Sequence, residues 1–323
     1  MTNLLVLREQ LKKFYGKYEI YITPISKFLL ALISLLLINQ RIGYMSSLNN
    51  IAIVLVLSLL CSFLPKNMTV IVVAAVTLAH LYKFSAECAI VALAVFLLLF
   101  ILYFRFSPKD TIAVLLTPVC FMLNIPYVMP LAMGLVGTPA SAVAVGSGTV
   151  VYYLLHFMNE SASILNSYEA DGAIEKIRFI IDDGLMGNQT MFVAVAGFVA
   201  TVIVVYLIRR MSIDYAWTIA IVTGTLLNIL IQLFGDLMYS TNISILGLLL
   251  GSIVSVILVK ILEFFVFNVD YSRTELVQFE DDEYYYYVKA VPKNTVAAPE
   301  KRVKTIRVPE KAVNRTKRET KNQ

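Results

Sequence analysis

The chain has 323 residues, of which 59% are hydrophobic and 15% charged, its formal net charge is +5, and its mean hydropathy is +0.76. Soluble domains carry about 25% charged residues, so this composition excludes an ordinary soluble domain. Solid apolar runs recur at the length of about 20 residues that a helix needs to cross a bilayer, without the alternation of a membrane β-barrel. We therefore expect an all-α, polytopic bundle of transmembrane helices in the cell membrane.

Residues 1–21 are predicted to form an amphipathic helix on the cytoplasmic surface of the membrane. Leu7, Leu11 and Phe14 recur at spacings of three and four, and charged residues occupy the other face. A solvated helix that packs against another part of the protein is the alternative.

The transmembrane domain is expected over residues 22–267 and contains eight predicted spans. They cover residues 22–40, 49–64, 68–83, 86–104, 110–125, 190–208, 215–237 and 243–267. Near the end of the last span, Lys260 and Glu263 are spaced to form an ion pair on one helix face. Such a pair is more often structural than part of a transport path.

The distribution of basic residues predicts the topology. Lys and Arg near span ends favour the cytoplasm, which places both termini on that side. The segment 159–189 has six acidic and two basic residues and is predicted to be an extracytoplasmic loop. If the membrane crossings are counted from each terminus, the sides assigned to the loops agree only if residues 126–158 enter and leave the membrane on the same face. We therefore predict a re-entrant, broken segment there; nine plain crossings that violate the charge rule are the alternative.

The small residues of "GLVGTPASAVAVGSG", from Gly134 to Gly148, suggest a helix start within this segment. Thr138 suits a helix cap, and a proline suits the first helical position. A helix that begins at membrane depth points its positive end into the protein, and transporters place such ends at anionic substrate groups. The sequence thus predicts a ligand site for an anionic group at Thr138, Ala140 and Ser141. Small residues that serve close packing alone are the alternative.

Two polar segments follow the transmembrane domain. Residues 268–293 are predicted to form a cytoplasmic β-hairpin around an acidic turn, and the part 273–293 is a candidate surface for a cytoplasmic partner. Residues 294–323 are basic and poor in apolar side chains, so we expect a disordered tail that binds anionic lipids of the inner leaflet. Binding to nucleic acid is not expected.

Motifs of catalysis are missing from the sequence. Its two histidines, His80 and His156, lack the spacing of a metalloprotease, and there is no phosphate-binding glycine loop. The three cysteines fall in apolar runs. We therefore expect no enzyme activity, no metal and no cofactor.

The stretches "VQFEDDEYYYYVKAVPK" (277–293) and "TPVCFMLNIPYVMPLAMGLVGTP" (117–139) resemble a group of multi-pass membrane proteins of Gram-positive anaerobic bacteria. Its members are loosely labelled transporter permeases. The resemblance implies a membrane bundle and carries over no functional residues.

Two functions are consistent with these features. The first is a permease-like transport component for a small molecule or a lipid headgroup. The alternative is a membrane scaffold that transports nothing and whose cytoplasmic tail recruits a partner. Eight spans exceed what an anchor needs, which favours the first, whereas the conspicuous tail favours the second.

Overall fold

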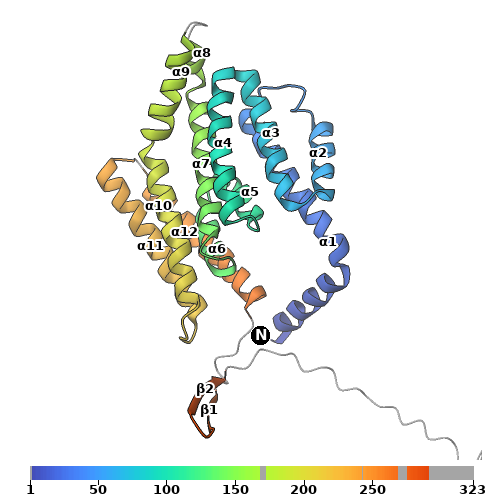
Figure 1. Ribbon diagram of the computed structural model, residues 1–323, viewed down its shortest axis with the longest axis vertical. Helices are drawn as coiled ribbons and strands as arrows, with labels where there is room; N and C mark the ends of the chain where they lie inside the picture. Colours follow the sequence, from blue (N-terminus) through green and yellow to red (C-terminus); the bar gives the residue numbers. More distant parts are fainter. Residues whose placement is uncertain (1, 168–171, 242, 268–274, 291–323) are drawn as a thin grey trace, which may run out of the picture.

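The computed structural model describes residues 2–167, 172–241, 243–267 and 275–290 (Figure 1). The described part is helical apart from one two-stranded antiparallel hairpin, which confirms the predicted fold class. The predicted tail 294–323 lies outside the described residues, as do the flanks of the predicted hairpin region.

Twelve α-helices and one π-helical segment follow one another along the described part of the chain. They are α1 (Thr2–Ile42), α2 (Ile51–Phe63), α3 (Lys66–Phe84), α4 (Ala86–Phe106), α5 (Thr111–Met122), α6 (Val128–Val136), α7 (Ser141–Glu160), α8 (Ala162–Ser167), α9 (Ala173–Phe179), the π-helical segment η2 (Ile180–Met186), α10 (Gln189–Arg209), α11 (Ala216–Tyr239) and α12 (Ile245–Val266). The strands are β1 (Glu275–Glu280) and β2 (Tyr285–Ala290).

Seven of the described helices are long and apolar enough to cross a membrane, namely α1, α3, α4, α7, α10, α11 and α12. The protein is therefore a multi-pass membrane protein. Two predicted spans are shorter than expected, because α2 has 13 residues and α5 has 12. At a rise of about 1.5 Å per residue, α5 extends about 18 Å, which is less than the thickness of about 30 Å of a hydrocarbon core.

The structure divides the predicted re-entrant range 126–158 into two helices, α6 and α7, and whether this range is re-entrant in a membrane stays a prediction. The second half of that range is the uninterrupted 20-residue helix α7. Helices α5 and α7 run side by side in the same direction: Asp110 at the start of α5 contacts Ser141 at the start of α7, and Phe121 stacks on Tyr152 with 4.4 Å between ring centroids. Helix α6 therefore returns the chain from the end of α5 to the level at which α5 began. We call the pair α5–α6 the re-entrant hairpin.

The end of α5 explains the short helix. Asn124 has a left-handed backbone (φ 59°), and its N–H donates to the Phe121 carbonyl at 3.1 Å. The Ile125 N–H donates to the Cys120 carbonyl at 2.9 Å. This pair of bonds is a Schellman motif, in which asparagine takes the position that glycine usually holds. Pro126, two residues after Asn124, prevents the helix from continuing.

The bundle has two ends with different contents (Figure 1). The lower end, where α10 ends and α11 begins, lies on the side of the β-hairpin, and the upper end, where α7 ends, lies on the side of α8 and α9. The predicted acidic loop belongs to the upper end. Which end faces the cytoplasm stays a prediction from the charge rule.

The predicted surface helix is the first part of α1. Helix α1 runs for 41 residues, contains Pro24 and bends at Tyr18, whose backbone is not helical (φ −115°, ψ 20°). Leu11 and Phe14 before the bend are exposed. Arg8 is buried, donates to the Phe264 carbonyl at 3.2 Å and lies over the Phe264 ring. The start of α1 therefore packs against the end of α12, and the remainder of the segment offers an apolar face to its surroundings.

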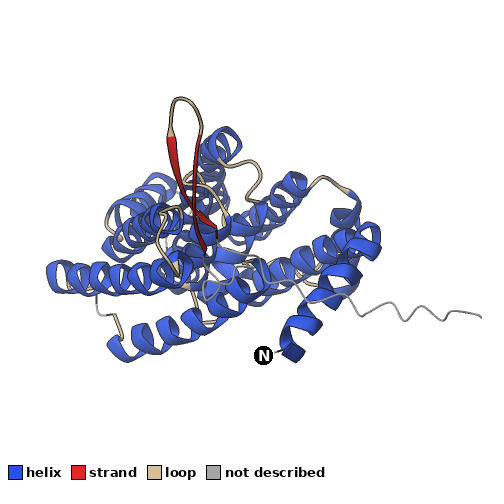
Figure 2. Cartoon of the chain, turned by 90° about the horizontal axis from the view of Figure 1, so that it is seen from below, coloured by secondary structure: helices blue, strands red, loops and turns tan. Residues whose placement is uncertain are grey.

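The β-hairpin lies outside the helix bundle, as the view from below shows (Figure 2). All residues of both strands are exposed, and Lys289 pairs with Asp214 before α11 at 2.7 Å. In the turn, the Asp281 carboxylate accepts hydrogen bonds from the Tyr286 hydroxyl and from the N–H groups of Glu283 and Tyr284, which lower the pKa of Asp281.

Candidate functional site

Small residues let the re-entrant hairpin and α7 pack closely. A Cβ atom at Gly134 would lie 2.6 Å from the Cβ of Val205 on α10, and Val205 also fills the space next to Gly224 on α11. A Cβ atom at Gly148 would lie 2.7 Å from the Cβ of Thr117 on α5 and 3.0 Å from the Val114 carbonyl. At Gly134 and Gly148, the absence of a side chain therefore permits close packing between helices.

The turn between α6 and α7 contains the three residues of the predicted anion site. Ser141 is fully buried. Its hydroxyl accepts a hydrogen bond from the Thr138 N–H at 2.9 Å and donates to a carboxylate oxygen of Asp110 at 2.7 Å. Ala140 contributes its carbonyl, which accepts from the Val143 N–H at 3.0 Å. The structure therefore brings Thr138 and Ser141 together, and an anionic group of the chain itself contacts Ser141.

Two features of α7 weaken the argument for a ligand at this turn. Helix α7 begins at the level of Asp110, at the lower end, and not at the middle of the bundle. Its first N–H groups are also occupied, since those of Ser141 and Ala142 donate to the carbonyls of Thr138 and Pro139 at 2.9 and 3.2 Å. A ligand at Thr138, Ala140 and Ser141 stays a prediction, and it would have to displace the Asp110 contact.

Arg209 holds the other side of this turn. Its guanidinium donates to the carbonyl of Leu135 and, at 2.6 Å, to the carbonyl of Gly137. Both carbonyls belong to the C-terminal end of α6, where a helix carries partial negative charge. The sequence analysis used Arg209 only as a topology signal. Its contact with α6 joins residues more than seventy positions apart, which no local pattern reveals.

An interior cavity lies beside the re-entrant hairpin, between α1, α3, α4, α5 and α7. Its volume is about 80 Å³, and apolar side chains such as Ala74, Phe100 and Val151 form its wall. A second cavity of about 50 Å³ lies next to it. The walls of the two cavities share the side chains of Ile38, Pro118, Met122 and Leu155.

The two cavities differ in chemistry. Buried Tyr103 lines the first cavity, and its hydroxyl contacts Thr111 at 3.0 Å and donates to Asn67 at 3.2 Å. The wall of the second cavity includes Arg41, His156 and Asn159. The first cavity is thus an apolar chamber, whereas the second has polar side chains in its wall.

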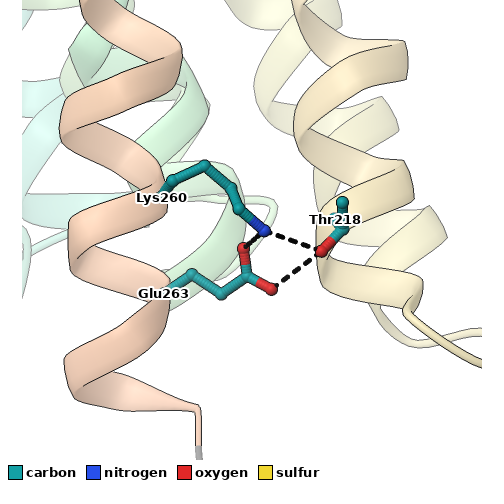
Figure 3. A network of polar contacts seen from close by, with 3 residues as sticks. All are labelled: Thr218, Lys260 and Glu263. Atoms are coloured by element: carbon teal, nitrogen blue, oxygen red, sulfur yellow. Dashed lines mark hydrogen bonds and ion pairs between the residues drawn. The ribbon is translucent and has the colours of Figure 1, made fainter. Parts of the chain in front are cut away.

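Two groups of polar side chains in the bundle contact one another within the protein. Lys260 forms the expected pair with Glu263 at 2.6 Å, and both contact Thr218 on α11, at 2.8 and 3.0 Å (Figure 3). His80 contacts the Asn39 side chain at 2.9 Å and accepts from the Met45 N–H at 3.2 Å. These contacts connect helices to their neighbours.

Metal ligands do not gather in the described part of the chain, where no three His, Cys, Asp or Glu side chains are placed to hold an ion. The three cysteines there are free and buried. The cavity is therefore the feature with the shape and chemistry of a binding site.

Comparison with known proteins adds no family to this description. Searches of protein-family models, of curated proteins and of solved structures gave no match to the chain. What the helices establish is the class, a multi-pass helical membrane protein.

Proposed function

We propose that the protein is a permease-like component that lets a small amphiphilic molecule or a lipid headgroup move across the bilayer along the apolar chamber. The observation that carries the proposal is the apolar chamber beside the re-entrant hairpin. Broken helices are tolerated at membrane depth where protein or a cavity surrounds them, and transporters build their sites from such helices. We further propose that the protein is not an enzyme.

The re-entrant hairpin is the moving part in this proposal. Asp110 and Arg209 hold its lower side, through Ser141 and through the carbonyls of α6. Release of these contacts would let the hairpin tilt away from α7 and open the chamber toward the lower end. Alternating access needs one element that rocks against a fixed neighbour.

A specific experiment tests this proposal. The purified protein is reconstituted into liposomes with single-chain lipids that carry a fluorescent nitrobenzoxadiazole label and neutral, zwitterionic or anionic heads. Dithionite quenches the outer leaflet, so continued quenching reports movement across the bilayer. We expect at least one lipid to move faster than in protein-free liposomes.

Two alanines of α3 provide the matched variants. Ala74 lines the cavity, whereas Ala75 is exposed on the outer face of the same helix. Ala74→Phe should fill the chamber and slow movement about tenfold or more, which corresponds to about 1.4 kcal/mol in the barrier. Ala75→Phe should leave the rate unchanged. Equal rates in both variants, or no movement with the wild-type protein, would overturn the proposal.

The scaffold function keeps one observation in its favour, which is the exposed β-hairpin fixed to Asp214 by Lys289. An isolated hairpin has unpaired edges on which a partner strand can add. Deletion of residues 268–323 separates the two functions. A permease keeps its lipid movement without this segment, whereas a scaffold shows no movement with or without it.

A further inference from the structure

We propose that a groove between α1, α3 and α5 at the lower end binds an anionic phospholipid of the adjacent leaflet, with the phosphate beside Lys27 and Lys66. The volume of this groove is about 270 Å³, and side chains of these three helices form its wall. The groove and the apolar chamber have different wall residues. The inference therefore goes beyond the proposed function and does not depend on it.

The three helices of the groove lie level with one another at the lower end. Lys27 of α1 donates to the carbonyl of Leu64, just before α3, at 3.0 Å. Thr111 at the start of α5 donates to the side chain of Asn67 at the start of α3, at 2.9 Å. From this level the three helices run toward the upper end (Figure 1). Wall residues that come later in each helix therefore lie deeper in the bundle.

The wall changes from charged to apolar along this direction. Lys27 on α1 and Lys66 on α3 come first. Leu30 and Ile33 follow Lys27 on α1, and Leu116 lies one turn and more into α5. A phospholipid has the same order, because its charged head stays at the membrane surface and its chains point to the middle of the bilayer.

The groove is open to the surroundings of the bundle and needs to hold only part of a lipid. Two wall residues, Ile33 and Ile112, are 42% and 47% exposed, so an acyl chain can pass from the groove into the bilayer. The volume of about 270 Å³ is larger than that of an engineered cavity of about 150 Å³, which holds one benzene molecule. The groove therefore has room for the glycerol region and the first methylene groups of a chain.

The charges of the groove fit an anion. Lys66 is exposed and makes no hydrogen bond or ion pair with any residue that the structure describes. It is the first residue of α3, where the helix dipole is positive and a nearby anion is favourable. Lys27 uses one of its three N–H donors for the Leu64 carbonyl. Among the described residues no Asp or Glu lines the groove, and Asp110, directly before α5, accepts from Ser141.

An anionic phospholipid satisfies both parts of the groove. Lysine binds phosphate as a point charge, and basic pockets between transmembrane helices bind anionic lipid heads. A zwitterionic lipid would bring its own cation close to the two lysines. A free phosphate would leave the apolar wall uncovered.

Quenching of tryptophan fluorescence by brominated lipids tests the site on the full chain in liposomes. Trp217 is the single tryptophan of the chain, so Trp217→Phe gives a dark background. Ile33→Trp then places a reporter in the groove wall, and Val222→Trp places a matched reporter at an exposed position of α11 outside the groove. Ile112→Trp is a second groove reporter for the case that Ile33→Trp does not fold. Brominated phosphatidylglycerol or brominated phosphatidylcholine is mixed with unbrominated phosphatidylcholine, and the quenching gives the relative affinity at each reporter.

We expect the groove reporter to show a preference of about tenfold for phosphatidylglycerol, since a lysine near anionic lipid contributes about 1 kcal/mol. The reporter at Val222→Trp should show almost none. Lys66→Gln should lower the preference at the groove about fivefold. Lys13→Gln is the matched control, because Lys13 is an exposed lysine of α1 outside the groove wall. Inorganic phosphate at constant ionic strength should leave the preference unchanged.

Three results would overturn the inference. An equal preference at the groove and at Val222→Trp would show general attraction of anionic lipid to a basic protein. An unchanged preference in Lys66→Gln, or an equal loss in Lys13→Gln, would remove the role of the groove lysine. Loss of the preference on addition of inorganic phosphate would identify a site for free anions. The lipid-movement assay with Ala74→Phe is independent of all three, so failure here leaves the proposed function standing.

Discussion

At the scale of single residues, two glycines of α7, Gly146 and Gly148, face different neighbouring helices and differ in how closely they are packed. Gly148 lies against α5, where Pro118 has no N–H to offer the Val114 carbonyl, and a Cβ atom at Gly148 would meet that carbonyl at 3.0 Å and the Thr117 Cβ at 2.7 Å. At Gly146 the nearest side-chain atom, from Val199, would be 3.6 Å away, which is ordinary contact. The sequence alone predicts the same packing role for both glycines. The difference between them depends on which side chains lie next to each one.

This difference predicts opposite effects of the same substitution. Gly148→Ala should lower the free energy of unfolding by about 1–3 kcal/mol, because the added methyl group overpacks the contact with α5. Gly146→Ala should be neutral or should raise stability by up to about 1 kcal/mol, since alanine favours the helix. Thermal unfolding in a mild detergent measures both. A lower midpoint for Gly146→Ala than for Gly148→Ala would contradict the packing described here.

At the scale of elements, the sequence predicted the long apolar helices and the interruption near Gly137, since α6 ends at Val136 and α7 begins at Ser141. It did not predict that α5 has only 12 residues and runs parallel to α7. A left-handed Asn124 ends α5, and Pro126 follows it. Composition reports apolarity, whereas tertiary neighbours decide how a short helix lies against the others.

The candidate site was predictable to the same limited degree. Thr138 and Ser141 lie in one turn as predicted, but Thr138 does not cap α7: the N-cap is Ala140, and the Thr138 N–H donates to the Ser141 hydroxyl. Asp110 and Arg209 come from distant parts of the chain, so their convergence on this turn depends on the fold. The cavity draws its wall from five helices and has no local pattern at all.

Two adjacent arginines test the role of the α6–α10 contact. Arg209 holds the carbonyls of Leu135 and Gly137, whereas Arg210 is exposed and donates to the Tyr206 hydroxyl at 2.6 Å. Arg209→Gln should lower the free energy of unfolding by about 1.5–3 kcal/mol, the range for hydrogen bonds to charged groups. Arg210→Gln should cost less than about 1 kcal/mol, as an exposed contact does. Equal midpoints of thermal unfolding would show that the contact contributes nothing specific.

At the scale of the whole molecule, the re-entrant hairpin reconciles the charge rule with the helix lengths. Helix α5 begins at the lower end, and helix α6 returns the chain to that end. Helix α7 then runs to the upper end. The basic ends of α4 and α10 and the start of α7 thereby share one side, and the acidic segment after α7 lies on the other. This arrangement agrees with the predicted charge asymmetry, and which end faces the cytoplasm stays a prediction.

Cysteine labelling in intact cells tests this topology, in a background in which Cys61, Cys88 and Cys120 are replaced by alanine. Ser163 follows α7 and is exposed, and Thr138 precedes α7 and is exposed. If α7 crosses and the lower end is cytoplasmic, Ser163→Cys should react with an impermeant maleimide, whereas Thr138→Cys should react only after the membrane is permeabilised. Ser212→Cys, in the loop between α10 and α11, should behave as Thr138→Cys does. Labelling of Ser163→Cys and Thr138→Cys from the same side would show that α7 does not cross the membrane. The reverse labelling pattern would show that the lower end is extracytoplasmic, which contradicts the orientation that the charge rule predicts.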